Sequence, residues 1–358
     1  MKILYISPEN TVGTLSLWKK AHEQKGNKCD FITLYKTRHK YDEGLCMNLP
    51  FISSKVFYRT IRHNYYKIYR GSLGDYQEKE GIPPIWEPNS NFEKLFFKFR
   101  DWIWNYKIQK YIKKYNLYNY DIYHLEWGLE FYRDCRFVKK LKQLNKKIIC
   151  TYHGQDLRTR GVIKEIDAIS QLNLTSEFDL LKKHPNINYL FLPYDTKKHK
   201  TNLNLNSTIR ICHSTSNRYY KGSDVIIPVC EELSKQSNVE FILIENTNHE
   251  LTLEIKNTCD ILIDQIDNRG GLGYGMNSIE AMSMGLCCIT ELTKSYINFI
   301  PDHPFINANS KTLFKKLNDL INNPNKILDA KQKSLNWVNK YHNYNNSINK
   351  LYSYYKTI

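Results

Sequence analysis

Short apolar runs that alternate with helical stretches limit the fold of this chain more than any other feature. The run KILYIS at 2–7 is followed by a loop with Gly13 and by a helical stretch over 14–26, which Gly26 closes at the position after its C-cap. The run CDFITLY at 29–35 predicts a second strand. A strand, a helix and a second strand in this order are typical of a doubly wound parallel sheet.

The same alternation recurs in two blocks of the chain. The first block continues with the runs YDIYHLE and KKIICTYHG, which are separated by a basic helical stretch around RFVKKLKQLN. The second block begins near residue 208 with TIRICHS, and the helical stretch SDVIIPVCEELSKQ and the runs VEFILIE, CDILIDQ and LCCIT follow it. Repeated strand–helix units in two blocks predict an α/β fold of two Rossmann-like domains that face each other.

A polar segment separates the two blocks. Residues 192–208 carry Asn and Lys without apolar periodicity, so we expect the domains to join there. The sequence therefore predicts an N-terminal Rossmann-like domain over 1–195 and a C-terminal Rossmann-like domain over 205–335. The polar, aromatic residues 336–358 are expected to form a helical tail.

Composition and cysteine usage restrict the class of protein. With 358 residues and 41% hydrophobic residues, the chain can bury a core in each of two domains. Its nine cysteines show no C-x-x-C pair and no metal-ligand spacing, which favours a reducing, cytoplasmic location. The apolar run at the N-terminus is too short for a secretory signal, and no run approaches the length of a membrane span.

The net charge of +16 is unevenly distributed. Residues 1–190 hold 33 Lys and Arg against 20 Asp and Glu, a net charge of +13, whereas residues 191–358 hold 19 against 16, a net charge of +3. We therefore expect the N-terminal half to face, or to lie near, something anionic.

A glycine-rich loop in the second block is the first candidate site. GGLGYG, Gly270 to Gly275, lies between the strand CDILIDQI and the helix NSIEAMSMG, at the strand end where open α/β sheets bind ligands. Glycines let the backbone approach a ligand, and amides of the first helical turn can bind phosphate or sugar oxygens. The Glu280 carboxylate, one turn inside the helix, can accept two hydrogen bonds from vicinal ribose hydroxyls. The alternative is an ordinary Glu that the helix dipole favours, beside a simple turn.

The segment HSTSNRYYKGSD adds two cations at the same sheet edge. Arg218 and Lys221 follow the first strand of the second block and precede a helix. Two cations there can neutralise a diphosphate leaving group. A charged turn without a ligand is the alternative.

Taken together, these segments resemble a known family. NRYYKG, CDILIDQ, the glycine loop and IEAMSMG, in this order, look like the C-terminal domain of GT-B fold glycosyltransferases of family four, which are retaining and use nucleotide sugars. YHGQDLR is similar to the His-Gly-x-Asp segment of that family, and DIYHLEWG agrees with it. The resemblance covers roughly residues 1–330 and is strongest over 208–290.

The resemblance implies a role for each matching residue. Glu280 would hold the ribose hydroxyls, and Arg218 and Lys221 would bind the diphosphate and stabilise its charge as the glycosidic bond breaks. His153 would hydrogen-bond the transferred sugar or the leaving phosphate. Other implied positions are Gly13, Gly273, Tyr274, Gly275, Met276 and Asn277 at the donor, and His124, Glu126 and Asp156 on the acceptor side. The implied enzyme needs no metal and no cofactor beyond the nucleotide sugar, which is a co-substrate.

One position departs from the family pattern. The family often carries a second Glu eight positions before the ribose-binding one, directed at the transferred sugar, and here that position is Leu272. The departure leaves the donor sugar open and keeps a non-catalytic, sugar-nucleotide-binding relative as an alternative. Retention of configuration is implied by the resemblance alone.

The acceptor is suggested by basic, aromatic segments of the first domain. Residues 91–116 interleave aromatic side chains with lysines, which suits an anionic bilayer that offers lipid-linked acceptors. A domain helix with its aromatic stripe in the core is the alternative. The segment 57–71 is similarly basic and aromatic, and such interleaving also suits nucleic acid.

We therefore expect a glycosyltransferase that moves a hexose-like sugar to a cell-surface glycan or glycolipid, in polysaccharide biosynthesis. It would be cytoplasmic and peripheral at the inner membrane face. A DNA-modifying glycosyltransferase of the phage type, acting on a hydroxylated base, is the alternative.

Overall fold

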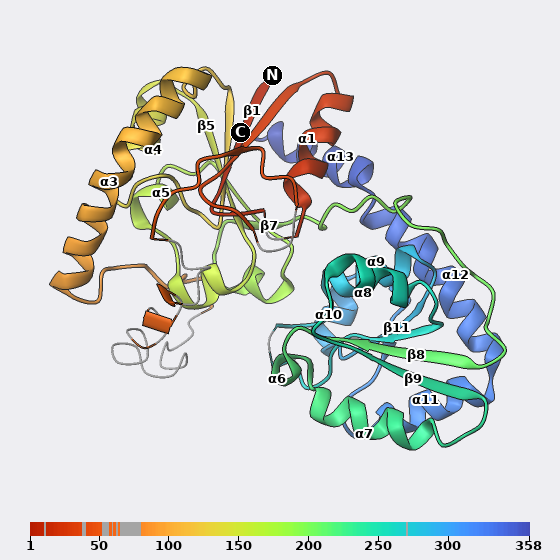
Figure 1. Ribbon diagram of the computed structural model, residues 1–358. Coiled ribbons are helices and arrows are strands. Elements are labelled where there is room, and N and C mark those ends of the chain that lie inside the picture. Colours follow the sequence, from red (N-terminus) through yellow and green to blue (C-terminus); the bar gives the residue numbers. More distant parts are fainter. Residues whose placement is uncertain are drawn as a thin grey trace. The chain divides into compact units, whose positions relative to one another are not determined.

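The computed structural model describes residues 1–10, 12–37, 41–51, 57–58, 60–61, 64, 80–269 and 271–358. Within it the chain divides into two compact units, each with its own parallel sheet (Figure 1). The first unit comprises Met1–Leu190 and Ile348–Ile358, and the second comprises Phe191–Ser347. Most of the basic, aromatic segment 57–71, and Gly270 of the glycine loop, lie outside the described residues.

The first unit is built on seven parallel strands in the order β3-β2-β1-β4-β5-β6-β7. The central strands are buried on both faces, which explains their continuous apolar runs. The strands are β1 (Lys2–Ser7), β2 (Lys28–Thr33), β3 (Leu45–Cys46), β4 (Ile122–Glu126), β5 (Lys147–Tyr152), β6 (Leu172–Thr175) and β7 (Ile187–Tyr189).

Helices cover both faces of this sheet (Figure 1). One face carries α1 (Thr14–Gln24) and α13 (Tyr344–Tyr355), and the other carries α3 (Asn91–Tyr115) and α4 (Arg136–Gln143). The unit also contains α5 (Lys164–Asp167), a π-helical turn, η1 (Asp156–Arg160), and a 3₁₀ turn, η2 (Phe178–Lys182). The predicted strand–helix–strand opening is confirmed, including Gly26, whose φ of 75° suits the position after a helix end.

The second unit is built on five parallel strands in the order β12-β11-β10-β8-β9. These are β8 (Ile209–Ser214), β9 (Val239–Ile244), β10 (Ile261–Ile263), β11 (Cys287–Thr290) and β12 (Ile306–Asn307). The helices are α6 (Arg218–Lys221), α7 (Ser223–Leu233), α8 (His249–Lys256), α9 (Met276–Ser283), α10 (Lys294–Phe299), α11 (Leu313–Asn322) and α12 (Pro324–Tyr341). Figure 1 shows α8 and α9 over one face of the sheet and α7 and α11 over the other. The predicted α/β class with two parallel, helix-covered sheets is confirmed.

The boundary between the units differs from the predicted linker. The division falls between Leu190 and Phe191, so the segment 192–208 belongs to the second unit. The Phe191 ring packs 5.1 Å from the Tyr341 ring, and the Tyr194 amide donates to the carbonyl of His342 at 2.7 Å. The polar residues of the segment do not indicate these long-range contacts.

The predicted tail over 336–358 is shared between the units rather than separate from them. Helix α12 ends the second unit, whereas residues from Ile348 onward pack on the first. The Tyr352 hydroxyl lies 3.0 Å from His22 Nδ1 of α1, and the Tyr354 hydroxyl donates to the carbonyl of Tyr189 at 2.9 Å. The last helix therefore completes the face of the first sheet that α1 covers.

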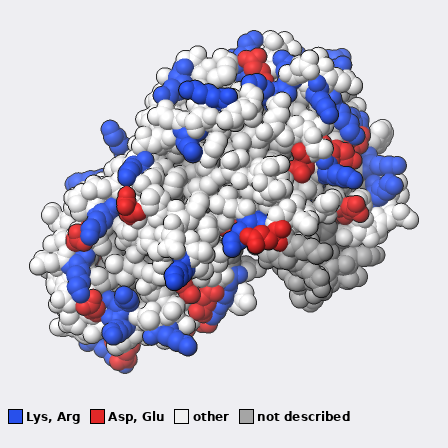
Figure 2. Space-filling model, turned by 180° about the vertical axis from the view of Figure 1, so that it is seen from behind, with Lys and Arg blue, Asp and Glu red and all other residues white. Residues whose placement is uncertain are grey.

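Two further properties concern the helices and the surface. Within the residues that the structure describes, no helix is both long enough and apolar enough to cross a bilayer. Figure 2 shows Lys and Arg side chains spread over one face of the molecule, with Asp and Glu beside many of them.

Candidate functional site

The topology of each sheet creates one point where a ligand crevice is expected. In the second unit β8 and β10 are neighbours, but the chain leaves β8 toward β9 and leaves β10 toward β11, on opposite sides. Connections that leave in opposite directions open a crevice at the carboxyl ends of the two strands, and ligands of open α/β sheets bind there. The segment with Arg218 and Lys221 follows β8, and the glycine loop follows β10. The two predicted ligand segments thus flank this point.

A buried carboxylate joins these two segments. Asp264 directly follows β10, and its side chain is fully buried. Its Oδ1 accepts from Lys221 Nζ at 2.5 Å and from Asn277 Nδ2 at 2.9 Å, while its Oδ2 accepts from the Ser278 hydroxyl at 2.6 Å. Burial alone would raise the pKa of Asp264, but the Lys221 ammonium and these hydrogen bonds hold it below its ordinary value. An ionised Asp264 therefore fixes Lys221 beside the start of α9.

Both predicted cations lie on the single turn of α6. The Asn217 side chain caps this turn by accepting from the amides of Tyr219 and Tyr220, at 3.1 and 3.3 Å. Arg218 and Lys221 are three residues apart, so their side chains leave the turn on one side.

Each cation keeps donors that its protein partners do not use. Arg218 pairs with Glu245 through Nε and Nη2, at 2.8 and 2.6 Å, and its side chain is 59% exposed. A guanidinium has five N–H donors, so three have no acceptor in the part of the chain that the structure describes. The Lys221 ammonium has three donors, and besides Asp264 it contacts only Gln265 Oε1, at 3.4 Å, within the described residues. Both cations can therefore bind an anion without breaking their present contacts.

The amino end of α9 provides a second anion-binding group. Its N-cap is Gly275, and among the described residues no side chain caps the helix, so the amides of Met276 and Asn277 keep no acceptor there, whereas the Ser278 amide donates to the Gly275 carbonyl at 3.1 Å. Gly273 has a φ of 83°, and a Cβ there would lie 2.0 Å from the Tyr296 ring, so only glycine fits. The Tyr274 hydroxyl lies 3.1 Å from His342 Nε2, and its ring packs on Phe305. Gly275 and Met276 thus lie at the amino end of α9, whereas the Gly273 amide donates to Asn268 Oδ1 at 3.4 Å and its carbonyl accepts from the Thr290 hydroxyl at 2.7 Å. The Tyr274 side chain is directed to His342 and Phe305.

The Glu280 carboxylate is hydrogen-bonded to two side chains of α8, Lys256 and His249. Its side chain is 6% exposed, with Oε2 at 2.6 Å from Lys256 Nζ and Oε1 at 2.7 Å from His249 Nε2. Burial raises the pKa of Glu280, but Lys256 and His249 outweigh this and lower it. Each carboxylate oxygen can accept two hydrogen bonds, so with respect to the described residues one position on each oxygen remains. Since His249 is 30% exposed, this ion pair reaches the surface on the His249 side.

The sheet of the first unit has its own crevice point between β1 and β4. These strands are neighbours, and the chain leaves them toward β2 and β5, on opposite sides. Glu126 ends β4, and its Oε2 is hydrogen-bonded to Nε2 of His153, which follows β5. Burial lowers the pKa of His153, but the Glu126 carboxylate outweighs burial and raises it to about 8. His153 is therefore an imidazolium at neutral pH, and its side chain is 28% exposed.

Three further predicted residues of this unit have different surroundings. Gly13 is the N-cap of α1 with a φ of 74°, and a Cβ there would lie 2.9 Å from the Tyr41 ring. The Asp156 carboxylate accepts from the amides of His153, Gly154 and Leu157, at 2.7 to 3.1 Å, so it organises the turn after β5. The structure corrects the acceptor-side role of His124, because this residue is 1% exposed and its Nε2 lies 2.5 Å from the Tyr355 hydroxyl. His124 is a core residue under α13 and cannot touch an acceptor there.

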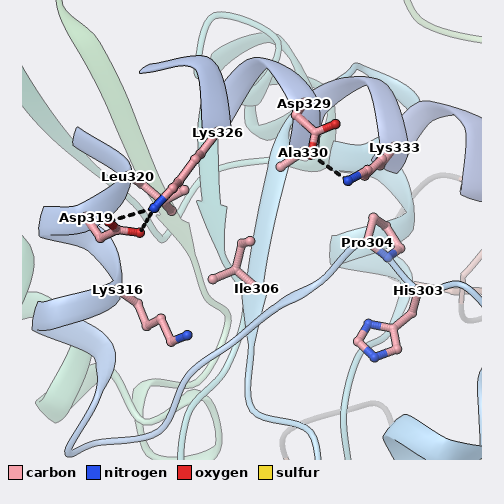
Figure 3. A pocket seen from close by; sticks show the side chains of 10 residues that line it. All are labelled: His303, Pro304, Ile306, Lys316, Asp319, Leu320, Lys326, Asp329, Ala330 and Lys333. Carbon is pink, nitrogen blue, oxygen red and sulfur yellow. Dashed lines mark hydrogen bonds and ion pairs between the residues drawn. The ribbon is translucent and has the colours of Figure 1, made fainter. Parts of the chain in front are cut away.

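A cavity elsewhere in the second unit does not belong to this site. It measures about 300 Å³ and lies beside α11 and α12, where Lys326 pairs with Asp319 and Lys333 pairs with Asp329 (Figure 3). No predicted site residue lines it.

The site partners Asp264, His249 and Lys256 were not singled out from the sequence. Asp264 carried a signal, because a carboxylate at the end of an apolar strand is expected at the ligand edge of a sheet. His249 and Lys256 are seven residues apart and share a helix face, but nothing in their spacing indicates a contact with Glu280.

Comparisons with known proteins support the fold. No family model and no curated protein sequence matches the chain. Among solved structures, HepE of Anabaena in complex with UDP is 11% identical, with a TM-score of 0.56 over 100% of both chains. Its complex with UDP-glucose gives a TM-score of 0.55 at 11% identity over the same shares. Sucrose-phosphate synthase from Thermosynechococcus elongatus is 12% identical, with a TM-score of 0.58 over 100% of this chain and 98% of that one. The chain thus has the GT-B fold, with two Rossmann-like domains.

Proposed function

We propose that the protein is a glycosyltransferase that transfers a sugar from a nucleotide-diphosphate sugar. One observation carries the proposal: the buried Asp264 holds Lys221 beside the uncapped amino end of α9, at the ligand edge of the second sheet. A cation and free helix amides together form a site for a diphosphate.

The same groups would stabilise the leaving group. As the bond between sugar and phosphate breaks, negative charge grows on the diphosphate, and preorganised cations stabilise that charge. Lys221 and Arg218 would supply this stabilisation, and Met276 and Asn277 would add their amides. His153 would donate a hydrogen bond to the transferred sugar or the phosphate. The proposal includes no metal and no cofactor besides the donor.

Glu280 would bind the donor ribose through its two remaining acceptor positions. HepE has been solved with UDP, with UDP and glucose, and with UDP-glucose, so UDP-sugars are the first donors to test. Leu272 contributes no carboxylate at the sugar, which leaves sugar recognition to other groups.

For the acceptor and the stereochemistry, we propose a cell-surface glycan or a lipid-linked glycan and retention of configuration. The basic first unit supports an acceptor that carries anionic groups. The nine cysteines are all free thiols and eight of them are buried, which supports a cytoplasmic location. The anomeric configuration of the product, read by proton NMR, tests retention.

A donor screen tests the central proposal. UDP-, GDP-, ADP- and CMP-sugars are compared by thermal shift and by slow hydrolysis. We expect one donor base to raise the melting temperature and to be hydrolysed, and the Arg218→Ala variant to weaken both effects because it removes a diphosphate contact. Lys235→Ala, which removes a 72% exposed lysine outside the site, is the control. A shift without hydrolysis would identify a binding protein, and no shift with any donor would exclude the proposal.

The pH dependence of donor hydrolysis tests the role of His153. Because Glu126 raises the pKa of His153 to about 8, its imidazolium is present at neutral pH and is lost as the pH rises through that value. We expect hydrolysis to decline above about pH 8 in the wild type. Glu126→Gln removes the carboxylate and leaves burial, so the decline should move down by about one pH unit or more.

Two further measurements make this test decisive. Glu165→Gln changes an exposed carboxylate of the same unit and should leave the profile unchanged. Imidazole resonances assigned with a His153→Gln variant should titrate at the same pH as the activity. An unchanged profile in Glu126→Gln, together with an unchanged fold, would remove His153 from the mechanism.

A further inference from the structure

Helix α3 is apolar on two opposite faces. Its inner face packs Trp104, Ile108 and Ile112 into the core of the first unit. On the opposite face, large apolar side chains spaced three or four residues apart remain exposed, by 51% to 80%: Phe92, Leu95, Phe99, Trp102 and Tyr106. Residues at this spacing form one continuous stripe. We call these five residues the α3 stripe.

These exposures contradict one of the interpretations of this segment. The alternative of an aromatic stripe in the core is wrong, because the aromatic side chains of the stripe point outward. Phe51 contacts one end of the region, with its ring 6.2 Å from that of Phe96 and 6.3 Å from that of Phe99. Trp102 and Tyr106, farther along, are 72% and 80% exposed. A row of exposed apolar groups of this size marks an interaction surface.

The charges of α3 are sorted between its two sides. Its two acidic residues lie on the inner side, where Glu93 accepts from the amide of Asn89 and Asp101 is paired with Arg100. The exposed charged residues of α3 are all lysines: Lys94, Lys98, Lys110, Lys113 and Lys114. The surface around the α3 stripe is therefore apolar and cationic, with no acidic side chain contributed by the helix.

We infer that the α3 stripe docks on the interface of an anionic lipid bilayer. Trp, Tyr and Phe settle at the boundary between headgroups and acyl chains, and lysines at the same level bind anionic headgroups. The inference deepens the proposed function by naming the surface at which a lipid-linked acceptor would be met. It needs no donor, so it can succeed or fail independently of the transfer reaction.

The chemistry of the stripe favours a bilayer over two other partners. A second copy joined by a two-fold axis would place this cationic helix against itself, and like charges would oppose the contact. Nucleic acid would use the lysines and the rings, but Leu95 has no ring on which a base could stack. A bilayer uses the rings, the leucine and the lysines together.

Vesicle binding of the full chain without donor tests the inference. We expect binding to phosphatidylcholine vesicles that contain phosphatidylglycerol, and little binding to phosphatidylcholine alone. The triple variant Lys110→Glu, Lys113→Glu, Lys114→Glu should bind about a hundredfold more weakly, because each lysine near an anionic surface contributes severalfold to the affinity. The matched control is Lys311→Glu, Lys315→Glu, Lys316→Glu, which changes the net charge equally on the second unit and should keep the affinity.

Tryptophan fluorescence reports which side chain enters the interface. Of the six tryptophans, Trp102 is 72% exposed, Trp127 is partly buried and the other four are buried. A blue shift on addition of anionic vesicles should therefore come from Trp102 and should disappear in Trp102→Phe, which retains a ring and most of the binding.

Three results would overturn the inference. One is equal loss of vesicle binding in the α3 triple variant and in its control, which would show an unspecific charge effect. Another is binding of the wild type to duplex DNA but not to vesicles, where the α3 triple variant loses the DNA binding. The third is a wild-type protein that sediments as a dimer and does not bind vesicles, where the Trp102→Ala variant sediments as a monomer. Donor thermal shifts of the α3 variants should equal those of the wild type, which separates this test from that of the proposed function.

Discussion

Replacing Lys221 with Met is expected to lower the kcat of donor hydrolysis by about a hundredfold to a thousandfold, with a smaller change in KM. The substitution keeps the length of the side chain and removes its charge. Asp264 orients the ammonium before the reaction, so no reorganisation is needed when charge develops on the diphosphate. An interaction that strengthens in the transition state appears in kcat rather than in KM.

Two comparisons isolate this effect from damage to the fold. Asp264 keeps its hydrogen bonds from Asn277 and Ser278 in the variant but loses its cation while it stays buried, so we expect the melting temperature to fall, and kcat is compared at a temperature where the variant is folded. Lys235→Met, which replaces an exposed lysine in the turn after α7, should leave kcat unchanged. A Lys221→Met enzyme with the wild-type kcat would mean that the lysine only anchors Asp264 and has no part in bond cleavage.

Replacing Glu280 with Ala is expected to cost about 3–5 kcal/mol of unfolding free energy, besides any loss of donor binding. The side chain of Lys256 is only 1% exposed, and the substitution would leave its ammonium buried without its carboxylate. A buried charge without a partner costs free energy of folding. Water can offset that cost only if the helix opens and the Lys256 ammonium is hydrated. Urea unfolding of the second unit, followed by the fluorescence of Trp337, measures the loss.

The pH dependence of stability gives an independent check of this ion pair. The folded pKa of Glu280 is lowered, so its contribution is present above the unfolded pKa, about 4.3, and is lost as the pH falls through the folded value. Glu280→Ala should therefore show a weaker loss of stability on acidification than the wild type. A double variant, Lys256→Met with Glu280→Ala, should recover much of the stability because no charge remains buried.

The same double variant separates the structural role of Glu280 from its binding role. If Glu280 binds ribose, the double variant should be stable but should bind the donor weakly, because two hydrogen bonds are missing. Donor affinity at the wild-type level in a stable double variant would leave Glu280 as a structural residue only.

The alternation of strands and helices was readable from the sequence because the central parallel strands are buried on both faces. Strands such as β1 and β10 appear as continuous apolar runs, and glycines such as Gly26 mark where helices end. The positions of Arg218, Lys221 and the glycine loop also followed, since residues just after parallel strands collect at one sheet edge. These inferences depend only on neighbours in the chain.

Tertiary structure decided everything that depends on residues far apart in sequence. It buried His124 under Tyr355, drew Lys256 and His249 onto Glu280, and divided the last 23 residues between two units. It also turned the aromatic stripe of α3 outward, because the opposite side of that helix is apolar as well and fills the core. Local pattern shows that a helix face is apolar, but only packing determines which apolar face the sheet covers. Burial and pairing are properties of the folded chain as a whole, so the charge state of Asp264, Glu280 and His153 could be derived only from the structure.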